Sequence, residues 1–194
     1  MRLVLATRNE HKLRELGDLL APHELVPLPA GVELPPETGS SFAENAAIKA
    51  RAAAAATGRP AIADDSGIVV EALGGGPGIR SARYAGEDAT DEENLARLLE
   101  ELRGEADRRA VYVCVLALVE PGRPPQLYEG RCTGVIVEAP RGSGGFGYDP
   151  AFLPDDRAPG DHRTMAELEP AEKDAISHRG RAARAVLEGL SVRA

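Results

Sequence analysis

Two adjacent acidic residues, Asp64 and Asp65, follow a short apolar run at residues 61–63 and precede Ser66 and Gly67. Because side chains alternate across a strand, only one of the two carboxylates is expected to face a site. A carboxylate there can hold magnesium or orient a water molecule for attack on phosphorus, chemistry that depends mainly on positioning and charge neutralisation. Asp and Gly are also common turn residues, so a polar turn without chemistry explains these four residues equally well.

A second polar segment, residues 7–12, joins an expected strand at residues 3–6 to an expected helix. The first backbone N–H groups of a helix and the positive end of its dipole favour a phosphate, and Lys12 adds a formal charge. Thr7 and Asn9 can each cap the helix, so a capped helix with a solvated lysine is the alternative. The segment lacks the Walker sequence and is therefore not a P-loop.

A helix is predicted over residues 41–57, because Ser41 and Glu44 fit a capping box and the Ala-rich run ends at Gly58. Asn45 and Lys49 are four residues apart and share a face, with Glu44 on an adjoining flank. Glu, Asn and Lys together can serve a metal–phosphate group. The alternative is structural: Glu44 completes the capping box and Lys49 is solvated.

The Gly-rich segment at residues 141–149 holds part of an aromatic cluster. Three of the chain's seven aromatic residues, Phe146, Tyr148 and Phe152, fall within seven positions. A ring on such a loop can stack on a base, or it can anchor the loop to the core. The glycines match a dinucleotide fingerprint by coincidence, since Pro150 prevents the helix that would bind the pyrophosphate.

The last predicted helix starts near Pro170 and carries Lys173, Ser177, His178 and Arg179. Lys173 and Ser177 share one face. A glycine at position 180 costs roughly 1 kcal/mol relative to Ala and therefore indicates a kink or a close approach. Seen alone, His178 is most simply a packed or surface histidine.

The elements that must position these residues form a mixed α/β pattern. Strand–helix units near the N-terminus are followed by a second amphipathic helix after Thr90 and a long hairpin over residues 110–119 and 127–137. Polar turns after strands mark the expected edge of the site. The length of 194 residues predicts a single domain spanning residues 1–194.

Composition narrows the possible partners. A net charge of −8 argues against a protein that grips the nucleic-acid backbone, but a small anionic substrate needs only a local cationic pocket or a bridging divalent cation. The two cysteines give no support for a disulfide framework or a zinc site, and no apolar run is long enough to span a membrane. We expect a cytoplasmic protein.

Six short motifs occur together in order along nearly the whole chain: Thr7-x-Asn9-x-x-Lys12, Ser41-Phe42-x-Glu44-Asn45-Ala46, Ala63-Asp64-Asp65-Ser66-Gly67, Pro77-Gly78-x-x-Ser81-Ala82-Arg83-Tyr84, Gly145-Phe146-Gly147-Tyr148-Asp149-Pro150 and Ser177-His178-Arg179-Gly180. This set resembles the inosine triphosphate pyrophosphatase family. The resemblance implies an elongated, two-lobed α/β fold with a central mixed sheet and flanking helices, a nucleotide cleft between the lobes, a homodimer and a requirement for Mg²⁺.

The resemblance also implies residue roles. Asp65 would be the catalytic base and a magnesium ligand, with Glu44 as a further ligand. The implied substrate-binding residues are Thr7, Arg8, Asn9, Glu10, His11, Lys12, Lys49, Ser66, Phe146, Gly147, Tyr148, Asp149, Lys173, His178 and Arg179. Residues 7–12 and Lys49 would contact the triphosphate and Ser66 would contact the substrate, whereas the residues from Phe146 onward would surround the base and sugar. Arg8 departs from the family pattern, in which Gly is common at this position. Its side chain would meet a phosphate or point to solvent.

The leading hypothesis is hydrolysis of inosine, deoxyinosine and xanthosine triphosphates to the monophosphate and pyrophosphate. Donors that face a 6-keto oxygen would be left unpaired, or opposed, by the 6-amino group of adenine. One alternative is a related house-cleaning pyrophosphatase for modified pyrimidine or methylated nucleotides. Another is a sensor that binds purine nucleotides without turnover.

Overall fold

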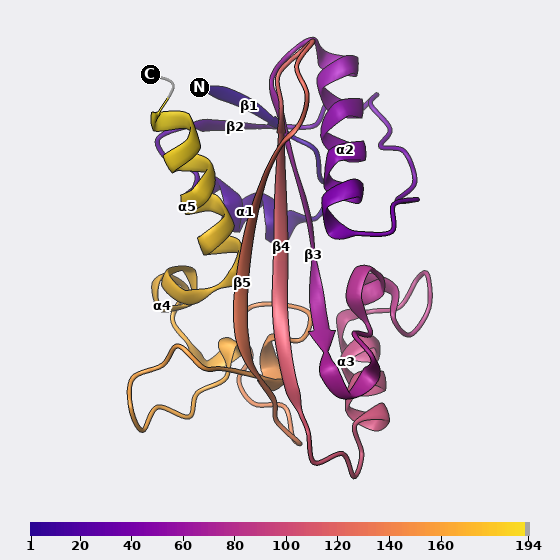
Figure 1. Ribbon diagram of the computed structural model, residues 1–194, viewed down its shortest axis with the longest axis vertical. Helices are drawn as coiled ribbons and strands as arrows, with labels where there is room; N and C mark the ends of the chain where they lie inside the picture. Colours follow the sequence, from indigo (N-terminus) through magenta and orange to yellow (C-terminus); the bar gives the residue numbers. More distant parts are fainter. Residues whose placement is uncertain (193–194) are drawn as a thin grey trace. The chain divides into compact units, whose positions relative to one another are not determined.

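The computed structural model describes residues 1–192 and contains a six-stranded sheet of order β2-β1-β3-β4-β5-β6 (Figure 1). The strands are β1 (Arg2–Leu5), β2 (Glu24–Pro27), β3 (Ala61–Val70), β4 (Arg109–Val119), β5 (Gln126–Ile136) and β6 (Phe152–Pro154). The α-helices are α1 (Glu10–Leu19), α2 (Phe42–Thr57), α3 (Asp91–Glu101), α4 (Pro170–Ile176) and α5 (His178–Ser191). Because β1 pairs in parallel with β2 and β3 while β5 pairs antiparallel with β6, the sheet is mixed. The predicted α/β class is confirmed.

The chain divides into two compact units. Unit 1 comprises Met1–Asp65, Cys114–Gly130 and Arg179–Ala194, and unit 2 comprises Ser66–Val113 and Arg131–His178. Strands β3, β4 and β5 each begin in one unit and end in the other. The single domain over residues 1–194 stays a prediction, as does the cleft. Within residues 1–192, no helix is long and apolar enough to cross a bilayer.

Unit 1 buries an apolar core between its strands and two helices. The core residues from the strands are Leu3, Leu5, Ile62, Cys114, Leu116 and Leu118. Those from the helices are Leu16 of α1, the C-cap residue Leu20 that follows it, and Ala182, Ala183, Val186 and Leu190 of α5. Helix α2 lies across the strands from α5 (Figure 1) and buries small side chains, among them Ala46, Ala50 and Ala53. Because these alanines are small, the helix backbone approaches the sheet closely. The polar side chains beside them in α2 therefore come close to the strands.

Unit 2 has its own core, formed by α3, the remaining strand halves and the Gly-rich segment. It includes Leu95 and Leu98 of α3 and the C-cap residue Leu102, together with Ile68, Val70, Tyr112, Ile136, Tyr148, Phe152 and Met165. Gly134 in β5 is needed for this packing, because a Cβ at this position would lie 2.4 Å from the carbonyl oxygen of Leu153 and 2.8 Å from the Phe152 ring. Tyr148 and Phe152 therefore anchor the Gly-rich segment to the core.

Most element boundaries agree with the sequence patterns. The predicted helix over 41–57 is α2, capped by Ser41 and ended by Gly58 with φ of 64°. The predicted hairpin strands correspond to β4 and β5 within one residue. Gly180, the expected kink, lies inside α5, and the break occurs at Ser177 instead, whose ψ of 155° separates α4 from α5.

The sequence pattern allows two strands that meet at a polar turn around residues 64–67, or one interrupted strand, and the turn is wrong. Asp64 and Asp65 lie inside the continuous strand β3 and are only 1% and 6% exposed. Turn propensity is a local preference, and here cationic side chains from other elements compensate the buried carboxylates. A single sequence window does not contain those partners.

Two glycine substitutions should change stability in opposite directions. Gly134→Ala should lower the free energy of unfolding by about 1–3 kcal/mol, because the added methyl group overpacks the contact with Leu153 and Phe152. Gly17→Ala in α1 should raise it by roughly 0.5–1 kcal/mol, since nothing lies within 4 Å of its added Cβ and Ala favours helix. Urea denaturation of both variants measures the two signs, and equal effects would contradict the packing described for β5.

Candidate functional site

The polar cluster around Asp65 in unit 1 joins β3, α2 and the irregular segment before α2. The Lys49 ammonium lies 3.1 Å from Asp65 Oδ1 and 2.5 Å from Glu37 Oε1. Lys49 and Asp65 are 8% and 6% exposed, so this group of charges is largely withdrawn from water. Two carboxylates therefore contact the same ammonium.

The surroundings of Asp65 and Lys49 shift the pKa of both groups. Burial, together with the neighbouring Glu37 carboxylate, raises the pKa of Asp65 to about 6, against the opposing effect of Lys49. Burial alone would lower the pKa of Lys49, but Asp65 and Glu37 raise it above its ordinary value. Asp65 Oδ2 is buried and accepts no hydrogen bond from residues 1–192. A buried carboxylate oxygen without a donor in the protein is an available ligand atom.

Asp64 points to the opposite face of β3 and has different partners. Lys12 from the start of α1 forms an ion pair with its Oδ1, and Arg179 Nε at the start of α5 lies 3.4 Å from its Oδ2. The Cys114 thiol donates to Oδ2 at 3.1 Å. Although Asp64 is buried, Lys12 and Arg179 hold its pKa far below the usual range. Arg179 Nη1 also lies 2.6 Å from Glu15 Oε2, so the network connects β3, β4, α1 and α5.

Residues 7–12 form a capped helix start. The Asn9 amide oxygen accepts the backbone N–H groups of His11 and Lys12 at 2.9 and 3.1 Å, and Thr7 Oγ1 accepts that of Asn9 at 3.2 Å. Several donors that the sequence offers to a phosphate are thus occupied by the cap. Arg8 donates to the carbonyl oxygen of Val32 at 2.7 Å.

Two further residues of that turn, Glu10 and His11, are exposed. His11 Nδ1 contacts Arg14 at 3.0 Å. Contact between residues 7–12 and a phosphate therefore stays a prediction.

In unit 2, Phe146 of the Gly-rich segment contacts Asp149 and Lys173. Asp149 Oδ2 accepts the Phe146 N–H at 3.0 Å and lies 2.8 Å from the Lys173 ammonium. The same ammonium lies 5.3 Å from the centroid of the Phe146 ring. Asp91 accepts the N–H of Gly147 at 2.8 Å. The backbone and the ring of Phe146 are therefore held by one buried ion pair.

Tyr148 and His178 are packed residues of unit 2. Tyr148 is 4% exposed and donates its hydroxyl to the carbonyl oxygen of Ser81 at 2.7 Å. His178 stacks on Tyr112 with ring centroids 4.5 Å apart and an interplanar angle of 5°. The imidazole orientation is thus fixed by an aromatic contact that sequence spacing does not reveal.

The structure sorts the predicted site residues into two sets. In unit 1 lie Thr7, Arg8, Asn9, Glu10, His11, Lys12, Lys49, Asp65 and Arg179, and in unit 2 lie Ser66, Phe146, Gly147, Tyr148, Asp149, Lys173 and His178. Contacts within the first set join Lys49 to Asp65, and contacts within the second join Phe146, Asp149 and Lys173. Arg179, expected beside the base, pairs with Asp64 and Glu15 in unit 1.

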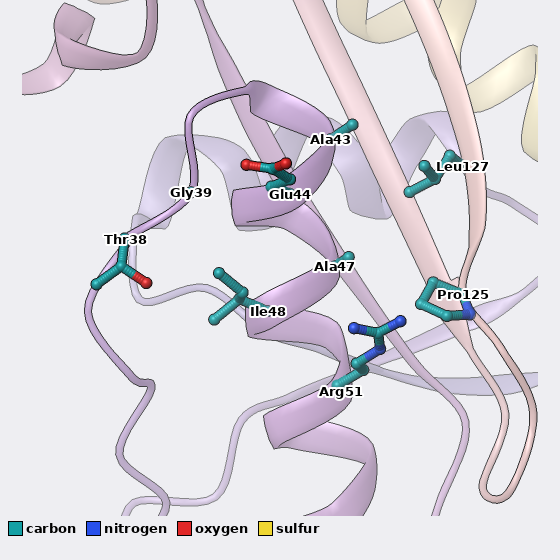
Figure 2. Close-up of a pocket in the computed structure, with 9 residues that line it drawn as sticks. All are labelled: Thr38, Gly39, Ala43, Glu44, Ala47, Ile48, Arg51, Pro125 and Leu127. Carbon is teal, nitrogen blue, oxygen red and sulfur yellow. The ribbon is translucent and has the colours of Figure 1, made fainter.

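Glu44, the expected second metal ligand, has a structural set of partners. Its carboxylate accepts the backbone N–H and the hydroxyl of Ser40 at 2.6 and 2.9 Å, and these bonds lower its pKa. Figure 2 shows it beside a cavity of about 500 Å³, with Thr38, Gly39, Ala43, Ala47, Ile48, Arg51, Pro125 and Leu127 as the other lining residues. Its assignment as a ligand stays a prediction, and the acid beside Asp65 is Glu37.

Sequence reasoning missed Glu37 because it lies in a Pro-rich segment without periodicity. A usable signal was present: an acidic residue just before a capped helix can reach a lysine two turns into that helix. Among residues 1–192, no three His, Cys, Asp or Glu side chains gather as a metal-binding group. A metal at Asp65 and Glu37 would therefore depend on ligands supplied by substrate or water.

Comparison with known proteins places these residues in a family. A model of the Ham1 family matches residues 3–189. The chain belongs to the Ham1 family. This Ham1-family chain is 51% identical to the dITP/XTP pyrophosphatase of Geobacillus kaustophilus over 93% of its own length and 89% of that relative. It is 52% identical to the dITP/XTP pyrophosphatase of Deinococcus radiodurans, over 96% of this chain and 91% of the relative.

Solved structures support the same membership. The structure of a HAM1 protein from Coxiella burnetii is 45% identical with a TM-score of 0.87, and it covers 100% of both chains. The Staphylococcus aureus Ham1 protein is 38% identical, also with a TM-score of 0.87 and 100% coverage of both chains. The family resemblance inferred from the six motifs is confirmed.

The Asp64 network of this Ham1-family chain predicts a pH-dependent stability. A folded-state pKa below the unfolded value of about 3.9 means that the stabilisation is fully present above that value and is lost as the pH falls below it. Asp64→Asn should cost about 3–5 kcal/mol near neutrality, because Lys12 and Arg179 lose their buried counterion.

Urea denaturation between about pH 7 and pH 3 tests this expectation. The decline in the free energy of unfolding toward low pH should be shallower in Asp64→Asn than in the wild type. The exposed residue Asp18 on α1 provides a matched control through Asp18→Asn. Identical slopes for wild type and Asp64→Asn would rule out this contribution of Asp64.

Proposed function

We propose that this chain is a Mg²⁺-dependent pyrophosphatase that hydrolyses inosine, deoxyinosine and xanthosine triphosphates to the monophosphate and pyrophosphate. The observation that carries the proposal is the Asp65–Lys49–Glu37 cluster, with its buried and unpartnered Asp65 oxygen. Family membership supports the substrate class, because the relatives at about half identity carry the name dITP/XTP pyrophosphatase.

The residues fit a magnesium ion. Mg²⁺ is commonly held by one or two carboxylates, with substrate phosphates and water completing an octahedron. Glu37 and Asp65 provide two carboxylates that contact the same ammonium, and Asp65 Oδ2 is a ligand atom without a hydrogen-bond partner among residues 1–192. When bound, the ion would neutralise phosphate oxygens and favour attack at phosphorus. Glu37 is the better candidate than Glu44, whose carboxylate is engaged by Ser40.

The chain's own residues supply the remaining steps. Asp65 orients a water molecule and accepts its proton, and a pKa raised to about 6 places this base near neutral pH. Lys49 lies beside Asp65 and stabilises negative charge that develops on the phosphates. Lys12, at the helix start of residues 7–12, adds a second cation, which Asp64 holds in place. The bond broken lies between the α- and β-phosphates, so pyrophosphate leaves in one step.

The second set of residues accounts for the base preference. Phe146 provides a ring for stacking, and its position is fixed by Asp149 and Lys173. Lys173 and His178 offer donors to a 6-keto oxygen, which the 6-amino group of adenine would oppose. Guanine must be rejected through its 2-amino group. In this proposal Arg179 stabilises the network of Asp64 and Glu15, and any contact with the base is additional.

The wider expectations belong to the same proposal: a homodimer located in the cytoplasm, with no nucleic-acid or membrane partner. The net charge of −8 supports the lack of a nucleic-acid partner. Sedimentation of the purified protein measures the oligomeric state directly.

Product analysis tests the activity. Inosine, xanthosine, adenosine and guanosine triphosphates are incubated separately with enzyme and Mg²⁺, and phosphate is measured before and after adding inorganic pyrophosphatase. We expect phosphate only after that addition, and mainly from the first two nucleotides. Asp65→Asn should reduce the rate by about 10²- to 10⁴-fold, the usual contribution of a general base. Direct phosphate release would contradict the mechanism, equal rates the specificity, and binding without turnover would favour the sensor.

A pair of carboxylate variants separates the candidate metal ligands. Glu37→Gln should raise the Mg²⁺ concentration for half-maximal activity by about tenfold or more, because the site loses a charged ligand. Glu44→Gln should leave it close to the wild-type value, since the amide oxygen can still accept from Ser40. A magnesium titration of the three proteins decides the assignment, and the reverse pattern would restore Glu44 as the ligand.

A further inference from the structure

The segment that carries Glu37 is attached to the first turns of α2 at successive points. Glu37 reaches Lys49, and the Gly39 N–H donates to Asn45 Oδ1 at 2.8 Å. Ser40 donates its backbone N–H and hydroxyl to Glu44, and Ser41 Oγ accepts the Glu44 N–H at 3.2 Å. The position of the Glu37 carboxylate is therefore set by one face of a helix, although the segment itself has no regular structure.

Asn45 is the buried member of these attachments. Its residue exposure is 0%, and its Oδ1 is used by Gly39. Its Nδ2 has no hydrogen-bond partner among residues 1–192. A buried amide donor without a partner lowers stability, by the cost of its desolvation. The one described side-chain hydrogen bond of Asn45 holds the backbone two residues after Glu37.

The chain contains a matched asparagine that completes its bonds. Asn94 follows the N-cap Thr90 of α3 by four positions, as Asn45 follows the N-cap Ser41 of α2. Asn94 Oδ1 accepts the Ala85 N–H at 2.8 Å, and its Nδ2 donates to the Ala82 carbonyl oxygen at 3.2 Å. The same local device thus fastens the preceding segment in both units. In Asn94 of α3 the side-chain oxygen and the side-chain NH2 are both hydrogen-bonded. In Asn45 of α2, among residues 1–192, only the oxygen that holds the Glu37 segment is hydrogen-bonded.

Gly39 allows the close approach that this bond requires. A Cβ at this position would lie 2.6 Å from Glu44 Cβ and 2.7 Å from Asn45 Oδ1, so any larger residue would push the segment away from α2. Gly31, in the same irregular segment, has nothing within 4 Å of an added Cβ. The steric constraint is therefore specific to the point at which Asn45 holds the chain.

We propose that Asn45, acting through Gly39, is a positioning residue that sets the Glu37 carboxylate beside Lys49 and Asp65. The inference rests on the proposed function, in which Glu37 and Asp65 hold Mg²⁺. Groups that orient a metal ligand typically change metal affinity by about 10–100-fold when they are removed. Asn45 itself touches neither the metal nor the reacting phosphate, so its loss should act on metal binding rather than on the chemical step.

The experiment compares Asn45→Ala with Asn94→Ala and Gly39→Ala with Gly31→Ala. Asn45→Ala and Gly39→Ala should each raise the Mg²⁺ concentration for half-maximal activity by about tenfold or more, with kcat at saturating Mg²⁺ near the wild-type value. Binding of Mn²⁺ to the nucleotide-free protein should weaken by a similar factor. This binding is measured by the decrease in the electron paramagnetic resonance signal of free Mn²⁺. Asn94→Ala and Gly31→Ala should leave both metal readouts unchanged.

The outcomes separate this inference from the proposed function. Asn94→Ala removes two side-chain hydrogen bonds and Asn45→Ala removes one, so the fall in melting temperature should be larger for Asn94→Ala, and it does not report on metal binding. If Asn45→Ala does not fold, Gly39→Ala carries the test, because Gly39 lies in the partly exposed irregular segment outside α2. Metal readouts for Asn45→Ala and Gly39→Ala equal to their controls, with Glu37→Gln still weakened, would overturn the positioning role alone. An unchanged Mn²⁺ affinity in Glu37→Gln would instead overturn the metal site of the proposed function.

Discussion

The burial of two adjacent carboxylates inside one strand is the constraint on which the rest of unit 1 depends. An ionised carboxylate loses several kcal/mol of hydration when it is buried, and this loss must be offset by partners of opposite charge. Strand alternation sends Asp64 and Asp65 to opposite faces of β3, so cations are needed on both sides of the sheet. Lys12 and Arg179 provide them for Asp64, and Lys49 provides one for Asp65. The starts of α1 and α5 and the middle of α2 are fixed to β3 by this requirement.

The two faces satisfy the requirement to different extents, and the difference separates structure from chemistry. Asp64 has two cations and a thiol donor, and its pKa lies far below the ordinary range. It is therefore a permanent anion that fixes Lys12. Asp65 shares the Lys49 ammonium with Glu37, has one oxygen without a donor among residues 1–192 and has its pKa raised to about 6. An incompletely compensated carboxylate can bind a cation or accept a proton, whereas a fully compensated one is inert.

Much of the fold follows from local sequence signals, but the partners of the charged residues do not. Capping residues and helical spacing predict α2 from Ser41 to Gly58, and apolar strand patterns predict β4 and β5 within one residue. The same local reasoning places Asp64 and Asp65 in a polar turn or at an interruption of a strand, because it treats them as exposed polar residues. Their burial depends on Lys12, Lys49 and Arg179, which are distant in sequence. Six motifs indicate the family, but Glu37 lies outside them, and its contact with Lys49 is established by the structure.

The places where local rules fail in unit 1 are concentrated around the proposed metal site. Two aspartates lie in the middle of a strand, a buried asparagine keeps an unpaired donor, and a carboxylate oxygen keeps an unpaired acceptor. Each feature lowers stability when it is considered alone, since a paired or apolar side chain would fill the same space at lower cost. The chain shows that it can avoid such a cost, because Asn94 performs the same attachment with both amide groups paired. The unpaired groups next to Glu37 and Asp65 are therefore better explained by binding and positioning than by folding, and the large alanine-lined interface of α2 with the sheet supplies the stability that offsets them.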